Sequence, residues 1–122
     1  MPERRPGKRL TIFVGEYDRY HHHPLAQAIL ERAREEGLAG ATMSRGIEGF
    51  GPSGRLKTSR FLSSSDDLPI VIDIIDDAHR IETFLPILDA MVTDGLITVE
   101  DADIVSYQAR DPHPLDDDPI AG

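Results

Sequence analysis

Four basic residues gather around one glycine-rich segment of a chain whose overall charge is strongly negative. Arg55, Lys57 and Arg60 lie within residues 48–68, and Arg45 closely precedes that segment. Glycine permits positive φ and close backbone approach, so bare N–H groups can face an anion while basic side chains reach around it. The pattern predicts a binding site for a phosphate or a carboxylate. The glycines of this predicted site are Gly46, Gly49 and Gly51.

The same segment also fits a simpler alternative, in which its basic residues pair with the acidic surface of this chain or of a neighbouring subunit. Residues 49–54 read GFGPSG and match G-x-G-x-x-G. A dinucleotide fingerprint requires a helix at its last glycine, whereas basic and serine-rich residues follow here. The segment exceeds the ~12–15 residues of most structureless connections, which favours a functional loop.

Three consecutive histidines, His21, His22 and His23, form a second candidate site. Imidazole binds transition metals, so a metal-ion site is an alternative use of this cluster. Adjacent side chains project in different directions, however, and a solvated polar turn before a helix explains the histidines better. Glu16 and Asp18 could form an acid–base group with His21, but no nucleophile accompanies them. We expect no catalytic residues and no enzyme activity.

Composition places these residues in a small acidic protein. The 122 residues include 13 Lys and Arg against 22 Asp and Glu, a formal net charge of −9, and the length suits one domain. Nonspecific nucleic-acid binding depends mainly on basic residues that displace counterions, so no nucleic-acid partner is expected. The absence of cysteine excludes disulfides, thiolate metal sites and cysteine nucleophiles. We expect no cofactor.

The N-terminal region contains only a short apolar run, at residues 10–14. A signal peptide needs an apolar stretch of about 7–15 residues, and a membrane-spanning helix needs about 20. We therefore expect a cytoplasmic protein without membrane insertion.

Hydrophobic periodicity predicts the elements that would hold the candidate sites. Apolar residues with period two indicate strands, and apolar residues at i, i+3, i+4 and i+7 indicate helices. Charged and proline-containing ends, at residues 1–7 and 108–122, are typical of disordered tails, which leaves a folded domain at 8–107. The expected strands are one at 10–14 buried on both faces, one at 41–47, a central one at 70–75, and one at 99–107 with residue 97 as its earliest start. The expected helices are one at 24–37 and one that is capped by Asp76 or Asp77, is kinked or divided into two segments near residues 83–86, and is closed by Gly95.

This order, βαββαβ, predicts an α+β protein with the ferredoxin-like split β-α-β fold. Two β-α-β units interleave into a four-stranded antiparallel sheet with two helices on one face. The other face must also be covered, and Phe13, Val71 and Val105 are candidates for that contact. We therefore expect subunits to associate through the sheet.

Several segments resemble the PII (GlnB-like) signalling proteins, whose long loop begins with a similar Gly-Phe-Gly. This chain has Glu48-Gly49-Phe50-Gly51 there, and over residues 10–107 it looks still more like an uncharacterised PII-like branch known as a domain of unknown function. The segments that carry the resemblance are FVGE at 13–16, PLAQAI at 24–29, REEGLAGAT at 34–42, RGIEGFG at 45–51, LPIVIDI at 68–74 and FLPILDAM at 84–91.

The resemblance implies a ferredoxin-like homotrimer with ligand clefts between subunits and a flexible loop at residues 48–68. PII proteins bind adenine nucleotides in these clefts and move the loop to engage transporters, enzymes or regulators. Gly49 and Gly51 correspond to the glycines at the base of that loop, where the backbone meets the ligand.

The chain departs from the PII pattern at two places. Pro52-Ser53 stands where PII proteins have Arg-Gln, and the loop contains no tyrosine that could be modified. Residues 93–103 contain one glycine, no lysine and four acidic residues, where PII proteins carry a phosphate loop rich in glycine and lysine. The residues with which PII proteins usually bind a triphosphate are therefore missing.

Together, the residues and the resemblance predict a PII-like trimeric regulatory protein. It would bind an anionic small molecule at inter-subunit clefts, with an adenine nucleotide as the ligand that the resemblance implies. The 48–68 loop would engage a partner protein such as a transporter or an enzyme. The alternative is a metal-ion-binding protein similar to the trimeric CutA family, with His21, His22 and His23 as ligands.

Overall fold

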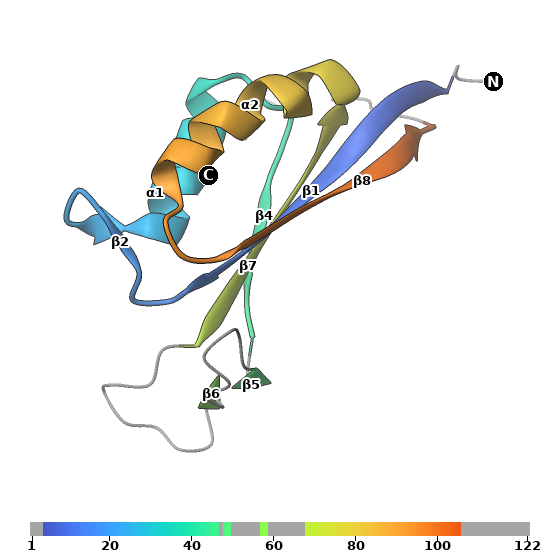
Figure 1. The fold of residues 1–122 in the computed structure, drawn as a ribbon. Coiled ribbons are helices and arrows are strands. Elements are labelled where there is room, and N and C mark those ends of the chain that lie inside the picture. Colours follow the sequence, from blue (N-terminus) through green and yellow to red (C-terminus); the bar gives the residue numbers. More distant parts are fainter. Residues whose placement is uncertain (1–3, 47, 50–56, 59–67, 106–122) are drawn as a thin grey trace, which may run out of the picture.

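The computed structural model of the chain describes residues 4–46, 48–49, 57–58 and 68–105. Figure 1 shows two helices packed across one sheet, with two smaller hairpins at its lower end and side. In chain order the elements are β1 (Arg5–Gly15), β2 (Arg19–Tyr20), β3 (His23–Pro24), α1 (Leu25–Glu35), β4 (Thr42–Arg45), β5 (Glu48–Gly49), β6 (Lys57–Thr58), β7 (Pro69–Asp77), α2 (Ala78–Met91) and β8 (Leu96–Ile104).

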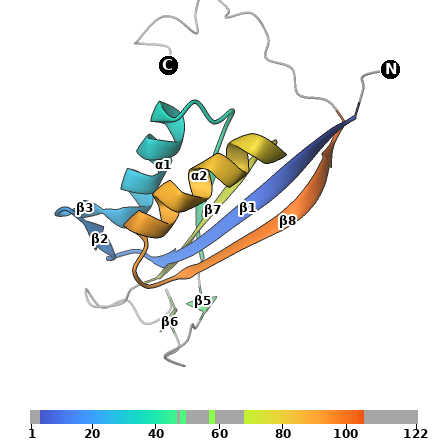
Figure 2. The same cartoon turned by 45° about the horizontal axis from the view of Figure 1, so that its top comes forward.

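The main sheet has the strand order β4-β7-β1-β8, and every neighbouring pair is antiparallel. Both helices lie on one face, and the described residues leave the opposite face open (Figure 2). Apart from the β2–β3 and β5–β6 hairpins, the order of elements is βαββαβ. The α+β ferredoxin-like fold expected from the sequence is confirmed, including the central position of the 70–75 strand.

Alternating residues of β1 and β7 form the core beneath the helices. Antiparallel pairing sets Leu10 opposite Ile74 and Ile12 opposite Ile72, so these side chains share the helix-facing side of the sheet. All four are fully buried, and burial of an aliphatic side chain of this size contributes about 1.5–3 kcal/mol. The helices complete the core with Ile29, Ile81, Phe84 and Leu88.

The strand at residues 10–14 is buried on only one face in the described chain, which corrects the expectation of burial on both. Phe13 points to the open face with 38% of its surface exposed, although its neighbour Thr11 is buried. The reason is that both helices pack against the same side of the sheet. An apolar residue in the open row therefore meets no second layer within the chain.

Strand boundaries differ from the expected ones because pairing extends beyond the apolar runs. β1 starts at Arg5, within the stretch that its charge assigns to a tail, because residues 5–7 pair with the end of β8 and Gly7 also pairs with Asp77 of β7. β8 begins at Leu96, one residue before the earliest predicted start at residue 97, and Leu96 faces Phe13. The predicted tail at 108–122 lies outside the described residues.

Both helices occur close to their predicted positions. α1 follows Pro24 and ends before Gly37, whose φ of 79° lets the N–H of Leu38 reach the carbonyl of Ala33. α2 continues through Pro86 as one helix, so of the two predicted alternatives, a kink or two segments, the second is wrong. Within the described residues, neither helix has the length and apolar character needed to span a membrane.

Asp76 has a structural role that differs from the predicted helix cap. Asp76 as a whole is only 5% exposed. Its carboxylate accepts hydrogen bonds from the backbone N–H groups of Ala39 at 2.9 Å and of Asp77 at 2.7 Å. Asp77 occupies the N-cap position without a side-chain capping bond. Asp76 therefore ties the α1–β4 connection to the end of β7.

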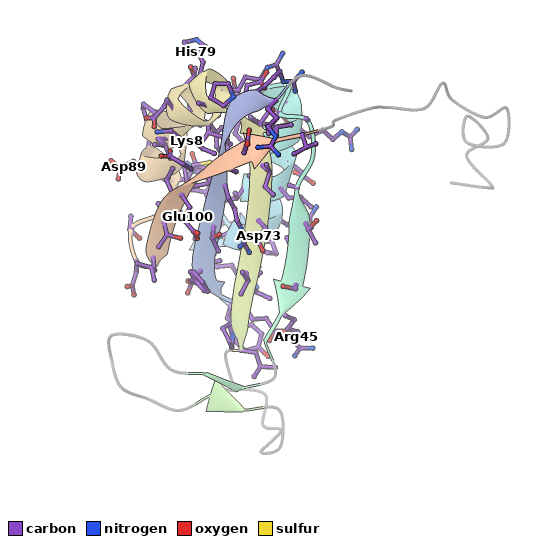
Figure 3. All side chains as sticks on the ribbon, turned by 90° about the vertical axis from the view of Figure 1, so that its right-hand side faces the viewer. Lys8, Arg45, Asp73, His79, Asp89 and Glu100 are labelled. Carbon is purple, nitrogen blue, oxygen red and sulfur yellow. The ribbon has the colours of Figure 1, made fainter. Side chains whose placement is uncertain are left out.

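Replacing Asp76 with alanine should lower the free energy of unfolding by about 1–3 kcal/mol, because two backbone N–H groups lose their buried acceptor. Equilibrium urea unfolding measures the change. Asp89→Ala, on the exposed surface of α2 (Figure 3), is the control and should change stability by less than about 0.5 kcal/mol. Equal stability of Asp76→Ala and the parent protein would contradict this role.

Candidate functional site

The ends of β1 and β4 and the start of β7 meet at one end of the sheet, where residues 47–67 connect β4 to β7. The N–H of Gly46 donates to the carbonyl of Pro69, and the N–H of Glu16 donates to the carbonyl of Leu68, both at 2.8 Å. We call Glu16, Arg45, Gly46, Leu68 and Pro69 the loop base. These backbone bonds hold the two ends of the connection beside the last residues of β1.

Gly46 is required at the loop base for steric reasons. A Cβ atom at this position would lie 2.7 Å from Cγ of Pro69, and the proline ring has little freedom to move aside. The glycine therefore permits the close approach of β4 and β7 that brings Arg45 to this end of the sheet.

Arg45 lies at this end of the sheet, next to the β5–β6 hairpin (Figure 3). Its Nη2 atom donates to Oε2 of Glu16 at 3.1 Å and lies equally close to Oε1. The side chain of Arg45 is 56% exposed and that of Glu16 is 25% exposed. The simpler alternative from the sequence, pairing of basic residues with the chain's own acidic groups, therefore applies to Arg45 in this structure.

The structure brings some of the predicted anion-site residues together. Gly49 of β5 is paired with Lys57 of β6, and β5 follows shortly after Arg45, the last residue of β4, and Gly46. Gly51, Arg55 and Arg60 lie outside the described residues.

The histidine cluster forms the turn of the β2–β3 hairpin. Tyr20 pairs with His23, and the two residues between them, His21 and His22, adopt φ values of 49° and 69°. Residues other than glycine, asparagine and aspartate rarely adopt this left-handed conformation, so the turn is locally strained. The rings of Tyr20 and His21 form a T-shaped pair with 4.3 Å between their centroids.

No group of three histidine or carboxylate residues in the described part of the chain is arranged to hold a metal ion. The three histidines are exposed and follow one another around the turn, so a single chain does not gather them around one ion. The metal-binding alternative gains no support from these residues.

The open face of the sheet carries a polar network that sequence reasoning missed. Asp73 of β7 accepts hydrogen bonds from Arg9 Nε at 3.0 Å and from Thr11 Oγ1 at 2.8 Å, both on β1. Arg5 and Asp77 form a further ion pair at 3.2 Å on the same two strands. The signal was present in the sequence: Asp73 stands between Ile72 and Ile74, and period two places it on the opposite face.

Apolar side chains occupy the half of the open face nearer the loop base. Phe13 is 38% exposed and its pairing partner Leu96 is 55% exposed. Val71 is paired with Phe13 from the other side, so these three residues form one row across β7, β1 and β8. The open face therefore has an apolar half and a half that carries the ion pairs together with Ile75, which is 45% exposed (Figure 3 shows Asp73 and Glu100).

Comparisons with known proteins agree with this architecture. Structures with the same fold include a protein from Thermus thermophilus described as a "putative PII-like signaling protein", with a TM-score of 0.62 and 17% identity over 84% of this chain and 93% of that chain. Another is CPII, a nitrogen regulatory PII-like protein from Thiomonas intermedia K12, with a TM-score of 0.61 and 19% identity over 87% and 94% of the two chains. The fold is thus that of the PII-like proteins.

Sequence comparison gives the family. Residues 7–104 match the family model DUF190, described as "Uncharacterized ACR, COG1993". A UPF0166 protein of Aquifex aeolicus is 36% identical over 98 residues, which are 80% of this chain and 92% of that protein. A UPF0166 protein of Methanocaldococcus jannaschii is 31% identical over the same share of this chain and 90% of its own length. The chain belongs to the DUF190 (UPF0166) family, which confirms the resemblance seen in the sequence.

The hydrogen bond from Arg9, followed by that from Thr11, lowers the pKa of Asp73 below its ordinary value of 3.8. A carboxyl group with a lowered folded-state pKa stabilises the fold above its unfolded-state pKa, and this stabilisation is lost as the pH falls through the folded-state value. Asp73→Asn should therefore be less stable than the parent protein at pH 7, and the difference should shrink below about pH 4. Urea unfolding between pH 7 and pH 3 measures it, with Asp89→Asn as control. A difference independent of pH would contradict the role of Asp73.

Proposed function

We propose that this protein is a PII-like regulatory protein that binds a small anion at the loop base and assembles as a homotrimer through the open sheet face. The observation that carries the proposal is the position of Arg45, whose exposed guanidinium stands where the long connection leaves the sheet. A guanidinium presents several N–H donors in one plane and suits carboxylate, bicarbonate and phosphate oxygens.

The anion site would combine Arg45 with the basic side chains of the connection that follows it. Gly46 allows close approach at the base, and the pairing of Gly49 with Lys57 brings a second basic residue onto the adjoining hairpin. The full proposed set is Arg45, Gly46, Gly49, Gly51, Arg55, Lys57 and Arg60.

The ligands of a similar structure suggest which anions to test. CPII from Thiomonas intermedia was solved with ADP, AMP and bicarbonate bound. Residues 93–103 of this chain lack the glycine- and lysine-rich phosphate loop of the PII proteins, which favours bicarbonate or a nucleotide with fewer phosphates than ATP. Their single glycine, Gly95, serves packing, because a Cβ atom there would lie 2.7 Å from the carbonyl oxygen of Phe13.

Assembly through the open face would cover the row formed by Phe13, Val71 and Leu96. Exposed apolar side chains in one row favour contact with another subunit, since burial of apolar surface contributes about 25 cal/mol per Å². The 48–68 segment would then engage a partner protein such as a transporter or an enzyme. The regulatory role in this proposal is suggested by CPII, which is described as a nitrogen regulatory PII-like protein.

Replacing Arg45 with glutamine should weaken binding of AMP, ADP or bicarbonate about tenfold or more, because a charge-assisted contact contributes about 1.5–3 kcal/mol. Isothermal titration calorimetry measures the affinities. Arg34→Gln, on the exposed surface of α1, removes the same charge elsewhere and should leave binding unchanged. Absence of binding by the parent protein to all three anions would contradict the proposed function, and equal affinity of Arg45→Gln would contradict the site.

Light scattering at micromolar concentration should show a trimer for the parent protein and a smaller species for Phe13→Glu. The added carboxylate would be buried without a partner in the assembled interface, which is strongly unfavourable. Gln27→Glu, on the exposed side of α1, adds the same charge and should leave the trimer intact. A monomeric parent protein would refute assembly through this face.

A further inference from the structure

The guanidinium of Arg45 is already paired within the chain, because its Nη2 atom contacts the carboxylate of Glu16. We infer that Glu16 is a built-in competitor of the bound anion and determines both the affinity of the site and its preference among anions of different charge. This inference rests on the proposed function, since it assigns a regulating residue to the same site.

The backbone holds Glu16 in place on a tight turn at the end of β1. Its own N–H donates to Leu68, and the preceding Gly15 donates its N–H to the Asp18 carboxylate at 2.8 Å. The N–H of Asp18 returns to the carbonyl of Gly15 at 3.2 Å. Glu16 is thus anchored by Leu68, which directly precedes β7, and by its own turn, whereas the longer side chain of Arg45 is the more exposed partner.

The charges of the described residues do not give the loop base a positive surplus. Within the loop base, Arg45 contributes one positive charge, and Glu16 contributes one negative charge next to the same nitrogen. An anion that approaches Arg45 must displace Glu16 or share the guanidinium with it. Both routes oppose binding, the first by loss of an ion pair and the second by repulsion between like charges.

The strength of this competition follows from the exposure of the pair. Exposed ion pairs are weak, so neutralising Glu16 should tighten binding by only about two- to fivefold. Repulsion between charges grows in proportion to the charge of the ligand. The gain should therefore be smallest for bicarbonate, larger for AMP and largest for ADP. Glu16 would thus favour anions of low charge.

The test is a double-mutant cycle with Glu16→Gln and Arg45→Gln, measured by titration calorimetry with bicarbonate, AMP and ADP. Glutamine keeps the size of the side chain and removes its charge. We expect Glu16→Gln to bind AMP about two- to fivefold more tightly than the parent protein does. In the Arg45→Gln background the same substitution should give a markedly smaller gain, because the competition acts through the guanidinium.

Two further variants separate this role from general effects. Glu36→Gln removes one negative charge and an ion pair with Arg32 on α1, away from the loop base, and should leave the affinities unchanged. Glu16→Ala removes the competing group entirely but keeps the backbone N–H that bonds to Leu68, and it should reproduce the gain. Thermal melts of each variant verify that it is folded.

Unchanged or weaker binding by Glu16→Gln and Glu16→Ala would overturn the inference, and weaker binding would make Glu16 a positioning residue for Arg45. An equal gain in the Arg45→Gln background or in Glu36→Gln would also overturn it, since the effect would then be one of net charge. If neither the parent protein nor the Glu16 variants bind any of the three anions, the proposed function fails as well. Binding by the parent protein without a gain in the variants refutes only the competitor role.

Discussion

The antiparallel ladder between β1 and β7 is the constraint on which the rest of the structure depends. It extends from the pair Gly7 and Asp77 to the pair Gly15 and Pro69. A shift of one residue would turn every side chain of a strand to the other face. The register therefore decides at once which residues meet the helices, which form the open face, and which strand ends meet at the loop base.

The two faces of this ladder carry different chemistry because the helices cover only one of them. The helix-facing side is aliphatic and closes around Ile12 and Ile72, both fully buried. The open side joins Arg9, Thr11 and Asp73 in one polar network next to an apolar row. Such a face can give a subunit contact both apolar area and a defined orientation, since ion pairs resist a shift in register.

The end of the same ladder links the fold to the proposed ligand site. Pairing of Gly15 with Pro69 places Glu16 beside Leu68, and the bond from Gly46 to Pro69 brings Arg45 to that point from β4. The site is thus built from three segments that are distant in the sequence. A ligand that bound Arg45 as proposed would replace its contact with Glu16, which joins β4 to the residue that follows β1.

Local patterns were sufficient to predict the order of elements, the two helices, the aliphatic core and the family resemblance, because periodicity and turn residues act over a few positions. Gly37 ends α1 as its sequence indicates, whereas Pro86 fails to divide α2 because the helix packs continuously against the sheet through Phe84 and Leu88. Only the tertiary structure decided that Asp76 holds the α1–β4 connection, that Asp73 meets Arg9, and that Glu16 meets Arg45. These contacts join residues 29 or more positions apart, and their existence depends on strand register and on the close approach at Gly46, which no local pattern encodes.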